Sequence, residues 1–200
     1  MTMGFAPSLR RPIALGFATV GVFFATLTAE ASDHLAVDAK VTDVSVAVTA
    51  SAQVHAPFAI IWQTLTDYDH LAEFIPGMNS SRVIERFGTG AIVEQEGNAG
   101  NSFLSYPIDV VIESDEYPPS TITAKIVSGN IRALDGAYHI QKVAGAENEN
   151  EFVLSWNGPI RPDIDLPDFI AEWAIRQNIR DQFRSMIDEI ERRARAANQS

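Results

Sequence analysis

The C-terminal part of the chain carries one long amphipathic pattern. Apolar residues recur there at helical spacing, namely Phe169, Trp173, Ile179, Phe183, Met186, Ile187 and Ile190. The other side of this pattern is charged, with Glu172, Arg176, Arg180, Arg184 and Asp188. Asp165 and Pro167 are typical of a helix start, so we expect one helix from Asp168 to about Ala194, about 40 Å long. Such a helix must bury its apolar stripe against one large surface.

The middle of the sequence supplies that surface. Alternating patterns predict strands at residues 40–49, 82–87, 91–96, 102–113, 121–127, 131–143 and 151–156. In the strand at 102–113, one face carries Leu104, Tyr106, Ile108, Val110 and Ile112, and the other carries Asp109 and Glu113. Strands joined by short turns indicate an antiparallel sheet.

Two short helices are predicted between the first strand and the rest. Pro57 begins the first helix, and Asp67 begins the second, which Pro76-Gly77 ends. The fold class is therefore α+β. We expect a bent antiparallel sheet of about seven strands, two short helices, and one long C-terminal helix across the concave face.

Two segments of this sequence resemble a known superfamily. The first is Val54 to Met78, where a Pro opens the helix, a Trp follows, an Asp-Tyr pair opens the second helix and a Phe-Ile-Pro closes it. The second is Gly136-Ala137-Tyr138-His139-Ile140, with Pro162 and Pro167 ahead of the long helix. Both resemble the START-like (SRPBCC, helix-grip) superfamily, in the branch of polyketide cyclases/dehydrases and coenzyme Q-binding START-type proteins. The resemblance covers residues 41–194.

This resemblance implies an apolar cavity between the sheet and the long helix. The candidate ligand-binding wall residues are Leu104, Tyr106, Ile108, Tyr138, Ile140, Leu154, Trp156, Phe169 and Trp173. The alternative for each is that it only fills the core. Phe169 and Trp173 are favoured as ligand contacts, because pockets in the family commonly open near that end. Tyr106, Tyr138 or His139 are candidates to orient a polar head group.

The N-terminus resembles an export signal. Arg10 and Arg11 precede an apolar run over residues 12–28, and Ala29-Glu30-Ala31 is a cleavage pattern. We expect a signal peptide at 1–31 cleaved after Ala31, a mobile lead-in at 32–40, and the ligand-binding domain at 41–197. The protein would then be exported and periplasmic. An uncleaved membrane anchor is the alternative.

Charge and composition exclude several functions. Residues 1–31 hold two of the 15 basic and one of the 26 acidic residues, so the remainder has 13 basic and 25 acidic side chains and a net charge of −12. Nucleic acid is therefore not an expected partner. Peripheral contact with a membrane stays open, and nothing points to a protein partner. The chain has no cysteine, and its four histidines lack metal-ligand spacing, so neither a metal nor a cofactor is expected.

These observations favour a binding protein for a hydrophobic small molecule, such as a lipid or an isoprenoid quinone. The alternative is an enzyme of the polyketide cyclase or dehydratase type that uses the same cavity. Asp109 beside His139 would be its acid–base pair, if the strand register were inverted. We expect no catalytic residues in the favoured register. A third hypothesis is a protein-interaction module with a filled interior.

Overall fold

The computed structural model describes residues 35–100, 105–146, 148–164 and 166–199. Eight strands, two α-helices and one 3-10 helix follow one another along these residues. In chain order they are β1 (Ala36–Val41), β2 (Val46–His55), α1 (Phe58–Leu65), η1 (Tyr68–Glu73), β3 (Met78–Phe87), β4 (Gly90–Gly100), β5 (Ser105–Tyr117), β6 (Thr121–Gly129), β7 (Ile131–Lys142), β8 (Glu151–Pro162) and α2 (Asp168–Ala197).

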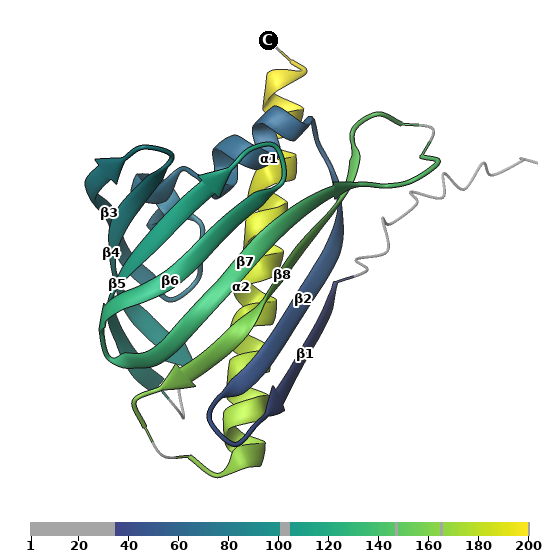
Figure 1. Cartoon of the computed structure of the whole chain (residues 1–200). Coiled ribbons are helices and arrows are strands. Elements are labelled where there is room, and N and C mark those ends of the chain that lie inside the picture. Colours follow the sequence, from purple (N-terminus) through teal and green to yellow (C-terminus); the bar gives the residue numbers. More distant parts are fainter. Residues whose placement is uncertain (1–34, 101–104, 147, 165, 200) are drawn as a thin grey trace, which may run out of the picture. The chain divides into compact units, whose positions relative to one another are not determined.

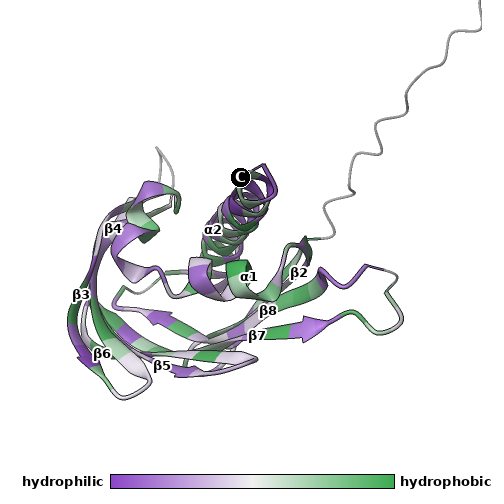
Figure 2. Cartoon of the chain, turned by 90° about the horizontal axis from the view of Figure 1, so that it is seen from above, coloured by the Kyte–Doolittle hydropathy of each residue, from purple (hydrophilic) through white to green (hydrophobic). Residues whose placement is uncertain are grey.

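All eight strands form one antiparallel sheet. Its order is β1-β2-β8-β7-β6-β5-β4-β3, so β3 to β8 form a meander and β2 returns to pair with β8. The sheet curves around α2, which lies on its concave side (Figures 1 and 2). The α+β helix-grip architecture predicted from the sequence is confirmed.

Strand β1 was not predicted from the sequence. It raises the number of strands from the expected seven or so to eight, and it lies where a mobile lead-in at 32–40 was expected. Residues 36–41 were predicted to lie mostly in a mobile segment, but they form an edge strand paired with β2 from Ala36–Ser51 to Val41–Val46. The alternation that suggested one strand at 40–49 is interrupted by a tight turn, in which the Thr42 amide donates to the Ser45 carbonyl over 2.7 Å. Leu35 and Ala39 are buried in the core, which gives this short strand its anchor.

The core lies between the sheet and the C-terminal half of α2. Phe183, Met186, Ile187 and Ile190 are buried there against sheet residues that include Leu154 and Trp156. The N-terminal half of α2, residues 168–182, contains no fully buried side chain. The two halves of the helix therefore meet different surroundings: a filled core at one end, and a looser region at the other.

Polar contacts fasten the N-terminal half of α2 to the sheet edge. The Val41 amide donates to Glu172 Oε1 over 2.8 Å, and Arg176 Nη2 donates to the Ala39 carbonyl over 2.9 Å. Both side chains were expected on the solvent side of the helix. They instead satisfy backbone groups of β1 that have no neighbouring strand. Within the described part of the chain, no helix has the length and apolarity needed to cross a membrane.

Candidate functional site: an apolar cavity under the long helix

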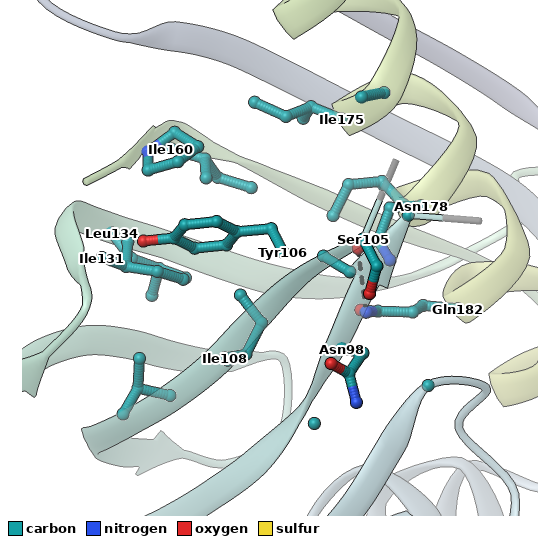
Figure 3. A pocket seen from close by; sticks show the side chains of 18 of the residues that line it. Asn98, Ser105, Tyr106, Ile108, Ile131, Leu134, Ile160, Ile175, Asn178 and Gln182 are labelled. Atoms are coloured by element: carbon teal, nitrogen blue, oxygen red, sulfur yellow. Dashed lines mark hydrogen bonds between the residues drawn. The ribbon is translucent and has the colours of Figure 1, made fainter. Parts of the chain in front are cut away.

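A cavity of about 210 Å³ lies between the sheet and the N-terminal half of α2. Ile108 of β5 lines it from the sheet, and Ile175 lines it from the helix (Figure 3). Val110 and Ile112 of β5 and Ile179 of α2 line it as well. The alternation of β5 points these residues to the concave face, as the sequence predicted for this strand. The cavity is therefore built from two apolar faces that approach each other without filling the space between them.

Small residues explain why the space stays open. Ala171 and Ala174 line the cavity from α2, whereas the same helix inserts Phe183 and Met186 into the core further along. On the sheet side, glycines also line the cavity, and Gly97 is one of them. A Cβ at Gly97 would lie 2.3 Å from the Gly77 carbonyl oxygen, so this close approach of two backbones requires glycine.

The cavity has a polar end and an apolar end. Asn98, Ser105, Asn178 and Gln182 gather on one side, and Gln182 Nε2 donates to Asn178 Oδ1 over 3.0 Å (Figure 3). Ile131, Leu134 and Ile160 lie on the other side, where the ring of Tyr106 reaches toward them. The Tyr106 hydroxyl donates to the Asn130 carbonyl over 2.6 Å, which fixes the ring as part of the wall.

Ionisable groups are scarce in this lining. Among the described lining residues, the carboxylate of Glu96 and the phenol of Tyr106 are the only ionisable side chains, and Glu96 is exposed. No group of three or more potential metal ligands occurs in the part of the chain that the structure describes. Chemically, the site offers apolar contact and neutral hydrogen bonds.

The predicted wall residues of the sheet separate into three groups. Tyr106 and Ile108 line the cavity, and Leu104 lies outside the described residues. The other sheet residues, Tyr138, Ile140, Leu154 and Trp156, do not line it but belong to the core or pack against it. These four residues lie in the part of the fold where large side chains from the C-terminal half of α2 fill the space.

Tyr138 and His139 also differ from their expected role as head-group ligands. The Tyr138 ring stacks on Phe183 with 6.3 Å between centroids, and burial raises the pKa of its phenol to about 12. His139 Nδ1 lies 3.3 Å from Thr121 Oγ1 on the neighbouring strand. Asp109 is exposed and not in the lining, so the structure does not form the inverted Asp109–His139 arrangement.

Phe169 and Trp173 are placed wrongly by the sequence analysis. Their side chains are 73% and 46% exposed, and neither lines the cavity. These two residues lie on the apolar stripe of the helix and were favoured because pockets in the family commonly open near that end, but this side of the N-terminal half does not face the cavity. In the N-terminal half, that line of the helix meets the edge strand β1 through Glu172 and Arg176, and Phe169 and Trp173 lie beyond it.

The cavity residues that the sequence did not reveal include three carboxamides: Gln95, Asn178 and Gln182. The sequence does contain a weak indication of two of these residues. Asn178 and Gln182 stand four residues apart, so they share one face of the helix, and Ile175 and Ile179 flank them. A neutral polar pair beside isoleucines on one face of a helix is worth testing as a site.

Comparisons with known proteins identify a matching family and solved structures with the same fold. A sequence model of the family described as polyketide cyclase / dehydrase and lipid transport matches residues 54–183. A search of curated protein sequences found no significant match.

Many solved structures share the fold. The chain is similar to the Zhui aromatase/cyclase from Streptomyces sp. R1128, with 17% identity, a TM-score of 0.60, and coverage of 76% of this chain and 96% of that one. It is similar to a START superfamily protein from Mycobacterium smegmatis, with 11% identity, a TM-score of 0.61, and coverage of 73% and 97%. It is also similar to a STAR-related lipid transfer protein (fragment 25–204) from Xanthomonas axonopodis, with 10% identity, a TM-score of 0.60, and coverage of 80% and 99%.

Proposed function

Because the chain belongs to the polyketide cyclase / dehydrase and lipid transport family of START-like proteins, we propose that it binds and carries a hydrophobic small molecule in the cavity under α2. Membership of the family supports either hydrophobic ligand binding or cyclase activity in a START-type fold. We favour a carrier of a lipid, an isoprenoid quinone or a similar molecule. The ligand would displace little ordered structure, because the space for it already exists.

One observation carries this proposal: the cavity is open, lined mostly by aliphatic side chains, and poor in groups that could transfer protons. A dry cavity of about 150 Å³ in another protein is enough to bind benzene. The cavity here is about 210 Å³, so it can hold a small ring or part of a longer apolar chain. A filled interior would have favoured an interaction module instead.

The first experiment is native mass spectrometry of the protein purified from its own host. A co-purifying apolar molecule is the expected result. Ala174→Phe places a ring in the cavity and should abolish that adduct, whereas Gln177→Phe, at an exposed position of the same helix, should retain it. No adduct in any preparation, together with no thermal shift from lipids or quinones, would overturn the proposal.

The alternative function is a cyclase or dehydratase, which the family description names beside lipid transport. Such an enzyme needs an acid or base in contact with the substrate, and Tyr106 is the cavity residue that could serve. Tyr106→Phe keeps the ring but removes the hydroxyl. An enzyme would lose turnover of a poly-β-ketone substrate in this variant while still binding it. A carrier shows no turnover in either protein.

Export is part of the same proposal. It is supported by the Arg10-Arg11 pair, the apolar run and the Ala29-Glu30-Ala31 pattern, all outside the described residues. We expect the protein from its own host to begin at Ser32 and to be recovered from the periplasm. An intact N-terminus in the membrane fraction would indicate a retained anchor instead. Two further predictions about partners remain: the protein does not bind nucleic acid, and peripheral contact with a membrane stays open.

A further inference from the structure

The polar end of the cavity is built from side chains that carry no charge. From the helix, Asn178 and Gln182 project toward Ser105 (Figure 3). Gln95 lines the cavity from β4. Gln95 is held by the buried Ser81 on the edge strand, with 3.4 Å between Nε2 and Oγ. Carboxamides from the helix and from the sheet therefore line the same cavity.

The Asn178–Gln182 pair retains hydrogen-bonding capacity. Their mutual bond uses one Nε2 hydrogen of Gln182 and the Oδ1 of Asn178. Among the described residues, no other hydrogen bond is formed by the Asn178 amide nitrogen or the Gln182 amide oxygen. A carboxamide offers both donors and an acceptor. The pair can therefore donate to a carbonyl and accept from a hydroxyl.

Charge works against an ionised ligand at this position. No lysine, arginine or histidine is found among the described residues that line the cavity, so an anionic head group would lose its hydration without gaining a counter-charge. The single carboxylate, Glu96, and the overall charge of −11 add repulsion.

From this arrangement we propose that the ligand is an uncharged amphiphile with a carbonyl or hydroxyl head, and that Asn178 and Gln182 select that head. This inference rests on the proposed function and names the ligand class for the same cavity. The apolar part of the ligand points toward Ile131, Leu134 and Ile160, at the opposite end. A fatty acid or a phosphate head is rejected from the polar end.

Three probes that share one alkylated ring test the selection: butylbenzene, 4-butylacetophenone and 4-butylbenzoate. Their dissociation constants are measured on the whole protein at pH 8 by displacement of a fluorescent apolar probe. The ketone should bind at least about tenfold more tightly than the benzoate, because the benzoate must be desolvated without a partner. Equal affinity for ketone and benzoate would overturn the inference without any variant being needed.

Gln182→Leu removes the pair's hydrogen bonds at similar volume. This variant should bind the ketone about fivefold more weakly, and it should bind butylbenzene equally well or more tightly. Asn178→Leu should act in the same direction, and Gln177→Leu, on the exposed side of the helix, should change nothing. An equal loss for all three probes in the Leu variants would contradict a selective role. If none of the probes binds the unaltered protein, the proposed function itself fails, and this inference fails with it.

Discussion

Gly136 on β7 shows how a single residue sets the packing beside the site. A Cβ built there would lie 2.5 Å from the Trp156 ring, so the ring occupies the volume that a side chain would need. Trp156 is buried in the core, and Gly158 approaches the same glycine from β8. The Gly-x-Tyr segment is thus a packing device for the tryptophan and not a ligand contact.

Gly136→Ala should therefore destabilise the protein by about 1–3 kcal/mol, because the ring must move into a filled core. Urea unfolding measures this change. The control is the double variant with Trp156→Phe, since the smaller ring leaves room for the added methyl. The double variant should lose less stability than the sum of the two single variants. Strict additivity would show that the ring does not limit this position.

Residue positions on β5 were predictable, and those on α2 were not. Strand alternation fixed Tyr106 and Ile108 on the concave face, because period two leaves only two choices. The positions of Phe169 and Trp173 could not be predicted without knowing which surface each half of the helix contacts. That depends on where β1 ends and where the helix crosses it, which no local pattern of α2 contains.

At the scale of elements, α2 holds β1 through side chains. The edge strand has only one neighbouring strand, and Glu172 and Arg176 satisfy one amide and one carbonyl on its other side. The β1 sequence is short, and Asp38 and Lys40 interrupt its apolar residues, which explains why it resembled a lead-in. The strand is held in place by residues distant in sequence, Glu172 and Arg176.

Glu172→Ala should release this strand. The Val41 amide loses its acceptor, so its hydrogen exchange should accelerate about tenfold or more, consistent with the loss of a hydrogen bond to a charged group. NMR-detected exchange on β1 and β5 measures the change. Asp181→Ala, an exposed acidic position on the same helix, is the matched control. Unchanged exchange at Val41 would contradict a role for this contact.

The second polar fastening joins η1 to the end of α2. Arg193 donates to Asp67 over 2.8 Å and to Glu189 over 2.6 Å. Hydrogen bonds from Arg192 and then Arg193 lower the pKa of Glu189 to about 2, although burial opposes them. Burial alone would raise the pKa of Asp67, but hydrogen bonds from His70 and Arg193 lower it.

These shifts give a signed pH dependence. A carboxylate with a lowered pKa in the folded state stabilises the protein above its unfolded pKa, and this contribution disappears as the pH falls through the folded pKa. For Glu189 that window runs from its ordinary value of 4.5 down to about 2. The free energy of unfolding should therefore fall between pH 5 and pH 2.

Arg193→Gln should reduce this acid dependence, measured by urea unfolding at several pH values. Arg195→Gln, whose guanidinium lies 3.7 Å from Glu191 on the exposed side, should leave the dependence unchanged. An identical slope in the Arg193 variant and the unaltered protein would contradict the argument. His70 acts at higher pH, because the hydrogen bond to Asp67 raises its pKa, and the exposed ring limits its effect.

For the whole molecule, the order of elements was enough to predict the architecture. A run of strands with short turns, followed by one long amphipathic helix, leaves few ways to bury both apolar surfaces. The size and position of the cavity were not predictable. They depend on Ala171 and Ala174 facing Ile108 and Ile112 across the space, which is a relation between distant segments.

The same arrangement predicts an uneven response to a ligand. Residues 168–182 cover the cavity without a fully buried side chain, whereas the rest of α2 is anchored in the core. Local opening should therefore cost less free energy in the first half of the helix, and its amides should exchange faster. A ligand in the cavity binds only the closed form, so it should slow exchange there in proportion to its occupancy.

Hydrogen-exchange mass spectrometry with and without butylbenzene tests this expectation. Protection should appear in residues 168–182 and on β5, and peptides covering residues 183–194 should change little. Ala174→Phe supplies the control, because its ring should slow exchange in the same segment without ligand and remove the response to butylbenzene. Protection spread evenly over the whole helix would instead indicate that the ligand stabilises the fold globally, and that α2 opens and closes as one unit.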